Sequence, residues 1–392
     1  MIKDEFFGSL INSCKTPAFI FDEDELRSRA FLIRSILGDD ISLCYSVKAN
    51  AFLVPALLDI VDFFEVCSPG EFDICTKLSV PCEKILYSGV HKDMWDVKRA
   101  VSYDSSIITA ESKKHYELIK AASKETGKKT RVILRLSSGN QFGMSKEDII
   151  DILKDPAEGV DIAGIHYFAG TGRSKLKRQM DELEKLDLFL GEQKERFSGD
   201  MPFFEYGPGL PFPYFEDEDR SDTLLPLKEL APKLLDLSKK YTVSIEMGRF
   251  LASSCGYYIT SVSDIKTSNG VNYCIVDGGI NHVSYLGQMI GMKVPVIRHF
   301  SDGRRVDDTD GEIFSICGSL CTINDVLVRS FAMRDPKEGD VLLFENIGAY
   351  SVTEAYGLFL SRPLPYVYML KDGKLKKSRE LTETWDINMG WM

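Results

Sequence analysis

The stretch Ile41–Asn50, with the sequence ISLCYSVKAN, joins an apolar run to a lysine near its end. A run of this kind is typical of a strand buried in a parallel sheet. Similar runs recur until about residue 250, and helical patterns separate most of them. Their alternation with helical segments indicates parallel strands joined by crossover helices. The eight runs are ISLCYSVKA, FFEVCS, KILYSG, SIITAE, RVILRLS, DIAGIHYF, FFEYGP and VSIEMGR.

The segment 174–197 illustrates the helical pattern between two of these runs. Its apolar residues recur every three or four positions, which predicts one buried stripe on a helix. Eight strand–helix units in about 230 residues match the size of a closed (β/α)₈ TIM barrel. We therefore predict an α/β chain in which residues 24–252 form such a barrel. A doubly wound open sheet is the alternative, because a strand count from one sequence can err by one. The stripe consists of Leu176, Met180, Leu183, Leu186 and Leu190.

The pattern changes after residue 253, where β-rich runs follow one another with few helical segments between them. Turns rich in Gly, Asp and Asn separate these runs, so we predict a mostly antiparallel β domain over residues 253–392. The opening segment TPAFIFDED also has the character of a strand. We expect residues 1–23 to contribute this strand to the β domain. The later runs are GYYITSVSDIKTS, VNYCIVDGG, FSICGS, VLVRSFAM and DVLLFENIG.

The composition excludes several classes of protein. The 48 basic and 59 acidic residues give a net charge of −11, which disfavours binding to nucleic acid or to an anionic membrane. The start MIKDEFFGSL lacks a signal-peptide pattern, and no apolar run has the length of a membrane span. The nine cysteines form no C-x-x-C pair, so neither a disulfide framework nor a metal site is indicated. We expect a soluble cytoplasmic protein with reduced thiols.

Three strand ends carry residues suited to chemistry, and in a TIM barrel the active site lies at the C-terminal ends of the strands. Lys48 follows the first run, and a buried lysine must be paired, neutralised or covalently used. Gly207-Pro208-Gly209 ends the seventh run and would let a phosphate approach the backbone. After the eighth run, Arg249 could clamp a phosphate and Glu246 could hold a proton on a heterocyclic nitrogen. Each feature taken singly has an alternative explanation. Lys48 could be a strand-end lysine that reaches solvent, the glycine segment an ordinary turn, and Glu246 with Arg249 a surface ion pair.

Together these residues supply the parts that hold pyridoxal 5'-phosphate. With them the sequence resembles the fold-type III pyridoxal-phosphate decarboxylases, the group of ornithine, arginine and diaminopimelate decarboxylases. That family implies a (β/α)₈ barrel and a β domain in the alanine racemase-like arrangement. The resemblance runs nearly from end to end. The matching motifs are 45–50 (YSVKAN), 65–71 (EVCSPGE), 141–144 (QFGM), 164–171 (GIHYFAGT), 207–209 (GPG), 246–249 (EMGR), 277–279 (DGG), 321–325 (CTIND) and 348–350 (GAY).

The resemblance implies a role for each cofactor residue. Lys48 would form the Schiff base with the cofactor, and Glu246 would keep the ring nitrogen protonated, which helps the ring to accept charge. The other implied cofactor residues are Phe168 at the ring face and Thr171, Gly207, Gly209, Arg249 and Tyr350 at the phosphate.

Cys321 matches the family position that returns a proton to the substrate carbon. In the family this cysteine reaches the active site from the partner subunit, so the resemblance implies a two-fold homodimer with shared active sites. The alternative for Cys321 is a buried apolar filler, as free cysteines often are.

Two departures from the family bear on the substrate. Phe168 stands where the family commonly has a histidine on the cofactor ring; a phenyl ring can stack but cannot carry charge. We expect Phe168 to stack and His166 to belong to the barrel wall. Thr322 stands where decarboxylases of diamino acids have an acidic residue, and a hydroxyl cannot pair with a distal ammonium in the same way.

The run Asp277–His282 also lacks the arginine and tyrosine of the diaminopimelate enzymes. The chain therefore resembles most the family members of siderophore and antibiotic pathways, whose substrates are larger and in some cases linked to a carrier protein. We predict Thr322, Asp325 and His282 as substrate residues, with Asp325 still able to meet a distal amine.

We therefore predict a decarboxylase that acts on an amino acid or an amino-acid-derived biosynthetic intermediate. A diaminopimelate or ornithine decarboxylase proper is one alternative. A racemase of the same fold is a second, which Glu246 disfavours because such racemases usually place an arginine at the ring nitrogen. The third is a non-catalytic relative that binds a partner protein, which the presence of Lys48, Glu246, Arg249 and Cys321 disfavours.

Overall fold

The structure is a computed structural model that describes residues 4–285 and 292–390. The chain divides into two compact units, one of residues 29–212 and 222–251 and one of residues 1–28, 213–221 and 252–392. The first unit contains the barrel and the second the β domain. Their main boundaries lie close to those predicted at residues 24, 252 and 253. Residues 213–221, which lie between two barrel segments in the sequence, belong to the β-domain unit, and this was not predicted.

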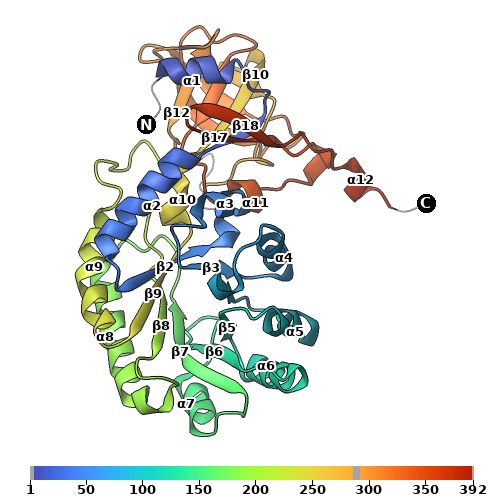
Figure 1. The fold of residues 1–392 in the computed structure, drawn as a ribbon. Coiled ribbons are helices and arrows are strands. Elements are labelled where there is room, and N and C mark those ends of the chain that lie inside the picture. Colours follow the sequence, from blue (N-terminus) through green and yellow to red (C-terminus); the bar gives the residue numbers. More distant parts are fainter. Residues whose placement is uncertain (1–3, 286–291, 391–392) are drawn as a thin grey trace. The chain divides into compact units, whose positions relative to one another are not determined.

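The barrel is a closed ring of eight parallel strands in the order of the sequence, as predicted (Figure 1). Each strand coincides with one of the quoted runs, and the ring closes where β2 pairs with β9. The open doubly wound sheet is thereby excluded. The strands are β2 (Ile41–Ser46), β3 (Phe63–Val66), β4 (Ile85–Tyr87), β5 (Ile107–Ala110), β6 (Thr130–Arg135), β7 (Val160–Phe168), β8 (Phe203–Gly207) and β9 (Thr242–Met247).

Helices follow the barrel strands and cover the outside of the ring (Figure 1). Four of them begin at a residue whose side-chain oxygen accepts a backbone N–H three positions later, which satisfies one free donor of the first turn. These caps are Ser68, Asp93, Ser112 and Ser145. The helices of this region are α2 (Glu23–Leu37), α3 (Val54–Leu57), α4 (Pro69–Lys77), α5 (Met94–Ser102), α6 (Lys113–Thr126), α7 (Lys146–Lys154), α8 (Leu176–Gln193), α9 (Leu225–Ser238) and α10 (Arg249–Ala252).

The predicted stripe on α8 is buried at Leu183, Leu186 and Leu190 and half-buried at Leu176 and Met180. A helix with one apolar face packs that face against the sheet and leaves its polar face in water. The helix is followed by a short 3₁₀ turn at Lys194–Arg196, so the predicted span 174–197 is close to the observed one.

The β domain is a mostly antiparallel sheet, as predicted. Its central strand β10 pairs with the N-terminal strand β1, with β11 and with β16. β1 also pairs in parallel with β17, so the N-terminal segment contributes a strand to this sheet. Strands β12, β13, β17 and β18 were not predicted. The strands are β1 (Ala18–Asp22), β10 (Gly256–Ser268), β11 (Val271–Val276), β12 (Ile297–Ser301), β13 (Arg304–Arg305), β14 (Glu312–Cys317), β15 (Val326–Met333), β16 (Val341–Phe344), β17 (Tyr366–Lys371) and β18 (Lys374–Arg379).

Three short helices accompany this sheet: α1 (Asp4–Ile11), α11 (Ser351–Glu354) and α12 (Trp385–Asn388). Phe7, Leu10 and Ile11 of α1 are buried in one apolar cluster with Tyr257 and Ile259 of β10. Among the helices that the structure describes, none is long and apolar enough to cross a membrane.

Candidate active site

Lys48 lies in a short 3₁₀ turn, Val47–Ala49, directly after β2. Its Nζ donates a hydrogen bond of 2.6 Å to Oε2 of Glu65 and one of 3.4 Å to Sγ of Cys67. Glu65 lies in β3, the strand next to β2 in the ring, and Cys67 directly follows β3. The side chain of Lys48 is therefore held against buried groups of the barrel, and the alternative of a lysine that only reaches solvent does not describe it.

Lys48 and Glu65 form an ion pair in which the Glu65 side chain is 3% exposed and that of Lys48 is 40% exposed. Burial by itself would raise the pKa of the Glu65 carboxyl, but the charge and hydrogen bond of Lys48 outweigh it and hold that pKa well below its usual range. Burial raises the pKa of the Cys67 thiol, which donates to Glu65 over 3.2 Å. The turn after β2 thus presents an ammonium group fixed by a carboxylate and a neutral thiol.

A second group of polar side chains fills the barrel interior under the ends of β7, β8 and β9. Candidate ligand atoms of His166, Glu205 and Glu246 all lie within 4.8 Å of one another, and all three residues are buried. Nε2 of His166 is 3.3 Å from Oε1 of Glu246. The interior of a TIM barrel is ordinarily filled by branched apolar residues, so three titratable side chains here are unusual.

Several atoms of this group lack a partner with hydrogen-bond geometry among the described residues. They are both ring nitrogens of His166, both carboxylate oxygens of Glu205 and Oε1 of Glu246. Burial raises the pKa of Glu205 well above its usual range, and the nearby Glu246 and Glu65 add to that rise, which favours the neutral form of this carboxyl. Buried polar atoms without partners are rare in native proteins and indicate a ligand or a catalytic role.

The residues around Glu246 fit a pyridine ring. Oε1 of Glu246 lies 3.3 Å from Nε2 of His166 but has no donor with hydrogen-bond geometry among the described residues, and a protonated ring nitrogen would supply one. A Cβ on Gly207 would lie 2.4 Å from Cδ2 of Phe168 and 2.7 Å from Oε2 of Glu246. Only glycine leaves space between the phenyl ring and the carboxylate, which agrees with a flat ring next to Phe168.

The loops after β7 and β8 and the start of α10 bring the predicted phosphate residues of the barrel together. Nε of Arg249 donates to Oγ1 of Thr171 over 3.1 Å. Gly209 has a φ of +59°, and a Cβ there would lie 1.8 Å from the carbonyl oxygen of Gly170. Glycine is thus required at position 209 both by conformation and by the close approach of the two loops. A cation, a hydroxyl and a side-chain-free turn are the groups that bind phosphate.

The predicted residues of the β domain lie on three of its loops, with His282 after β11, Cys321, Thr322 and Asp325 after β14, and Tyr350 after β16. Cys321 and Asn324 are exposed in the turn between β14 and β15, and Thr322 is half-buried. Tyr350 precedes α11 and has a φ of +68°, an unusual backbone conformation for a residue with a side chain. Such strained positions are often found at functional sites.

His282 and Asp325, which were predicted as substrate residues, both make hydrogen bonds within the β domain. The carboxylate of Asp325 accepts the backbone N–H groups of Ile280 and Leu320 at 2.9 and 2.7 Å. The ring of His282 is buried and bonded to the Tyr258 hydroxyl, and burial lowers its pKa to about 4. Asp325 thus holds the Cys321 loop within the β domain, whereas His282 bonds to Tyr258 and to the carbonyl of Pro363. A substrate contact by either side chain would require these bonds to break, and the substrate role of both residues stays a prediction.

Sequence reasoning missed Glu65, Cys67 and Glu205 as members of the site and assigned His166 to the barrel wall. The structure places His166 in the barrel interior, beside Glu246. A signal existed: each of these polar residues interrupts an apolar strand at a position that shares a face with Lys48, Phe168, Gly207 or Glu246. A polar residue inside an otherwise apolar strand is the pattern to look for.

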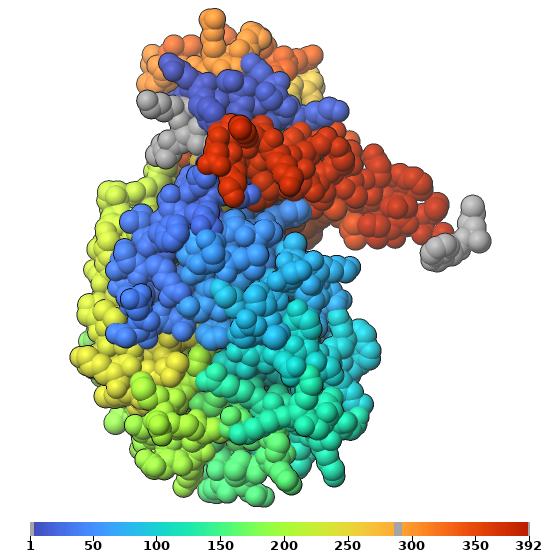
Figure 2. Space-filling model, viewed as in Figure 1, coloured from blue at the N-terminus to red at the C-terminus, as the bar shows by residue number. Residues whose placement is uncertain are grey.

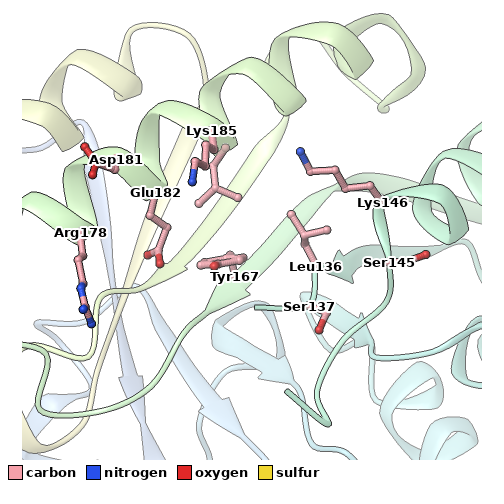
Figure 3. Close-up of a pocket in the computed structure, with 10 residues that line it drawn as sticks. Leu136, Ser137, Ser145, Lys146, Tyr167, Arg178, Asp181, Glu182 and Lys185 are labelled. Atoms are coloured by element: carbon pink, nitrogen blue, oxygen red, sulfur yellow. The ribbon is translucent and has the colours of Figure 1, made fainter. Parts of the chain in front are cut away.

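A separate pocket of about 380 Å³ lies on the outer side of β7, between that strand, α7 and α8 (Figure 3). Tyr167 lines it, and strand alternation turns Tyr167 away from the face that carries His166 and Phe168. Figure 3 shows Glu182 of α8 directed toward Tyr167. This pocket is therefore distinct from the barrel interior that contains Lys48.

A ring of eight parallel strands with a lysine, a buried carboxylate and a glycine turn beside an arginine at the strand ends has the parts expected of a pyridoxal-phosphate-binding barrel protein. Residues 30–348 match the family model described as "Pyridoxal-dependent decarboxylase, C-terminal sheet domain". The chain belongs to this family. The predicted family, cofactor and reaction class are confirmed: it is a pyridoxal 5'-phosphate-dependent decarboxylase of an amino acid or an amino-acid-derived intermediate.

The relatives agree with this assignment. Diaminopimelate decarboxylase of Aquifex aeolicus is 24% identical over 386 residues, covering 93% of this chain and 89% of the relative. L-glutamyl-(BtrI acyl-carrier protein) decarboxylase of Niallia circulans is 25% identical over 413 residues, with 97% and 94% covered. The 2-((L-alanin-3-ylcarbamoyl)methyl)-2-hydroxybutanedioate decarboxylase of Staphylococcus aureus is 25% identical, with 90% and 93% covered.

Solved structures share the fold. Diaminopimelate decarboxylase of Methanocaldococcus jannaschii superposes with a TM-score of 0.84 at 21% identity, covering 97% of this chain and 93% of that one. The predicted combination of a (β/α)₈ barrel with a β domain is thereby confirmed.

Proposed function

We propose that this decarboxylase acts on a biosynthetic intermediate without a free distal ammonium, and that Lys48 is the residue that binds the cofactor. The observation that carries the cofactor assignment is the buried oxygen of Glu246, which has no hydrogen-bond donor among the described residues, beside the space that Gly207 leaves open. It coincides with an ammonium group at Lys48 that the buried Glu65 and the half-buried Cys67 hold in place.

Bound pyridoxal phosphate supplies the electron-accepting ring that stabilises charge on the substrate carbon when carbon dioxide leaves. The chain's own residues hold and orient this group. Glu246 keeps a proton at the ring nitrogen, Phe168 covers the ring face, and Arg249 with Thr171 and Gly209 binds the phosphate. Glu65 and Cys67 fix the Lys48 amine, whose donated hydrogen bond of 2.6 Å shows how firmly it is oriented.

We further propose that Cys321 and Tyr350 act across the two-fold interface of a homodimer. Support comes from apolar side chains exposed near Cys321, since exposed apolar patches often mark interfaces. Ile323 is 94% exposed, and the Arg362 guanidinium donates to the carbonyl of Ser319, which ties the Cys321 loop to a second loop. That second loop and the C-terminal segment, red in Figure 2, expose further apolar residues: Leu358, Phe359, Leu360, Trp385 and Ile387.

The substrate proposal rests on Thr322. A hydroxyl there leaves a distal ammonium without a partner carboxylate, whereas it can bond an amide or a carboxylate of a larger substrate. The names of two relatives specify such substrates, an L-glutamyl group on an acyl-carrier protein and a hydroxybutanedioate conjugate of L-alanine. We propose a substrate of this kind, free or carrier-linked, and no nucleic-acid or membrane partner.

The proposal includes the cytoplasm as the place of action. All nine cysteines are free, and unpaired thiols are usual in a reducing compartment.

The test is release of carbon dioxide from a panel of purified substrates. The panel contains diaminopimelate, ornithine, lysine, a citryl-diaminopropionate conjugate and a glutamyl group on a carrier protein. We expect turnover with a conjugated substrate and little with the free diamino acids. Efficient turnover of diaminopimelate or ornithine would overturn the substrate proposal, and racemisation without release of carbon dioxide would overturn the assigned reaction.

A further inference from the structure

The loops that follow β7 and β8 hold each other at one point. The backbone N–H of Arg173 donates to the carbonyl of Gly209 over 2.8 Å. The carbonyl of Gly170 lies where a Cβ of Gly209 would be. Neither loop has regular secondary structure here, so its shape depends on side chains that support it from outside.

Arg173 is anchored by Glu182 of α8. Its Nη1 and Nη2 donate to Oε1 and Oε2 of Glu182 over 2.9 and 2.8 Å, in a bidentate pair. The hydroxyl of Tyr206, from the end of β8, donates to Oε1 over 2.8 Å. One carboxylate on α8 therefore fixes a residue of the loop after β7 and a residue at the end of β8.

Gln179 adds a bond from the same helix. It lies three positions before Glu182, on the same face, and is buried. Its Nε2 donates to the carbonyl of Pro208 over 2.9 Å. α8 thus supports both loops at adjacent positions, with Gln179 on the backbone of Gly207-Pro208-Gly209 and Glu182 on Arg173.

The ionisation states of Arg173 and Tyr206 favour stable hydrogen bonds to Glu182. Burial by itself would lower the pKa of Arg173, but the bonds to Glu182 raise it, so the guanidinium remains charged. Burial raises the pKa of the Tyr206 hydroxyl, which therefore stays a donor. The side chains of Arg173 and Glu182 are only 18% and 13% exposed, so water screens their pair less than it screens a surface pair.

We propose that Glu182, acting through Arg173 and Tyr206 and aided by Gln179, is a positioning residue that fixes the two loops in the shape that binds the cofactor phosphate. The inference rests on the proposed function, because it takes these loops as the phosphate site. Glu182 does not itself bind the phosphate; it sets where Thr171 and Gly209 lie. The effect on ligand binding should therefore depend on the phosphate group.

Asp187 offers a matched control on the same helix. It accepts Nζ of Lys240 and the hydroxyl of Tyr241, each over 2.8 Å. Like Glu182, it is a carboxylate of α8 that receives one cation and one tyrosine hydroxyl. Tyr241 precedes β9, however, so Asp187 lies at the N-terminal ends of the strands, away from the phosphate loops.

The experiment measures dissociation constants for pyridoxal phosphate and for pyridoxal, which lacks the phosphate. Equilibrium dialysis is carried out on full-length protein whose cofactor has been removed. For Glu182→Gln we expect the affinity for pyridoxal phosphate to fall about tenfold or more, as for loss of a charge-assisted hydrogen bond, and that for pyridoxal to stay within about twofold. For Asp187→Asn we expect both affinities to stay at the wild-type value, with a similar loss of thermal stability.

Three outcomes are decisive. An equal loss for both ligands in Glu182→Gln, or no loss for either, overturns the positioning role. If Glu182→Gln does not fold, Arg173→Lys takes its place, because it keeps the positive charge but cannot form the bidentate pair with Glu182. If Arg173→Lys does not show the same phosphate-dependent loss of affinity, the proposal fails. Wild-type protein that binds pyridoxal phosphate no better than pyridoxal would instead contradict the phosphate site of the proposed function.

Discussion

Two buried histidines show how the barrel and the β domain treat polar groups differently. In the β domain, His299 of β12 is fully buried, and its ring nitrogens lie 3.0 Å from Asp308 and 3.0 Å from Asp340. In the barrel, His166 is equally buried and its Nε2 lies 3.3 Å from Oε1 of Glu246, but neither nitrogen has a partner with hydrogen-bond geometry among the described residues. A hydrogen-bonded buried group stabilises the fold, whereas a buried group without hydrogen bonds points to a ligand, an ordered water or a catalytic role.

The comparison predicts that substitutions in the barrel interior affect chemistry more than folding, and that substitutions around His299 do the reverse. The largest expected effect is that of Lys48→Ala. Purified wild-type protein should absorb visible light through the cofactor bound to Lys48, and borohydride should add the cofactor mass to the Lys48 peptide. Lys48→Ala should lose the band, the mass and the activity together, while exposed Lys129→Ala retains all three. A band that persists in Lys48→Ala would contradict the assignment.

Glu246→Gln should lower turnover by about 10²-fold or more, because a charge-assisted contact to the reacting system is lost. The cofactor should still bind, since Lys48 and the phosphate residues are unchanged. Stopped-flow rates and the visible spectrum measure the two effects separately. Because the Glu246 oxygen lacks a partner in the cofactor-free chain, thermal stability without cofactor should not fall. Turnover at the wild-type rate would show that a different carboxylate serves the ring.

A mixture of Lys48→Ala and Cys321→Ala chains tests whether the barrel and β-domain residues work across two subunits. Each homodimer should be nearly inactive. Random exchange should place about half of the chains in mixed dimers with one intact site of two, and so restore about a quarter of the wild-type activity. Native mass spectrometry must first detect the mixed dimers. If they form and activity does not return, both residues act within one chain.

His299→Gln should lower the free energy of unfolding by about 3 kcal/mol, since it leaves buried carboxylates without their cation. The matched change His166→Gln should lower it by less than about 1 kcal/mol in cofactor-free protein, because no formed hydrogen bond is lost. Urea denaturation of both variants measures the difference. Equal losses would show that the two buried histidines do not differ as proposed.

The smallest predicted effect is a pH dependence of that stabilisation. Burial by itself would lower the pKa of His299, but Asp308 and Asp340 raise it above its usual value, with Arg305 also near Asp308. A raised folded-state pKa means that the stabilisation is complete below the unfolded pKa of about 6.5 and disappears as pH rises through the folded value. The difference between wild type and His299→Gln should therefore shrink from pH 6 upward. A difference that grows with pH would contradict a charged His299.

The sequence alone predicted most of the architecture, because each barrel strand is a short apolar run and each helix has a periodic apolar face. β12 was missed because Arg298 and His299 break the apolar pattern. Both are buried all the same, since Glu345 and Asp4 pair with Arg298 and the two aspartates with His299. Such pairing joins residues distant in the chain, and a local pattern cannot reveal it.

The candidate active site also has one part that the sequence predicts and one part that only the tertiary structure reveals. Lys48, Gly207, Glu246 and Arg249 could be predicted from the sequence, because residues at the ends of parallel strands meet at one end of a barrel. Only the tertiary structure decided that Glu205 and His166 lie beside Glu246, because closing the ring brings strands together that are far apart in the chain. It likewise decided that α8 supports the phosphate loops, since a carboxylate on a helix surface shows no partner until the packing angle of that helix is set. The local spacing of apolar residues determines where helices and strands form and where they end. Which buried charged side chains lie next to one another depends on how the barrel closes.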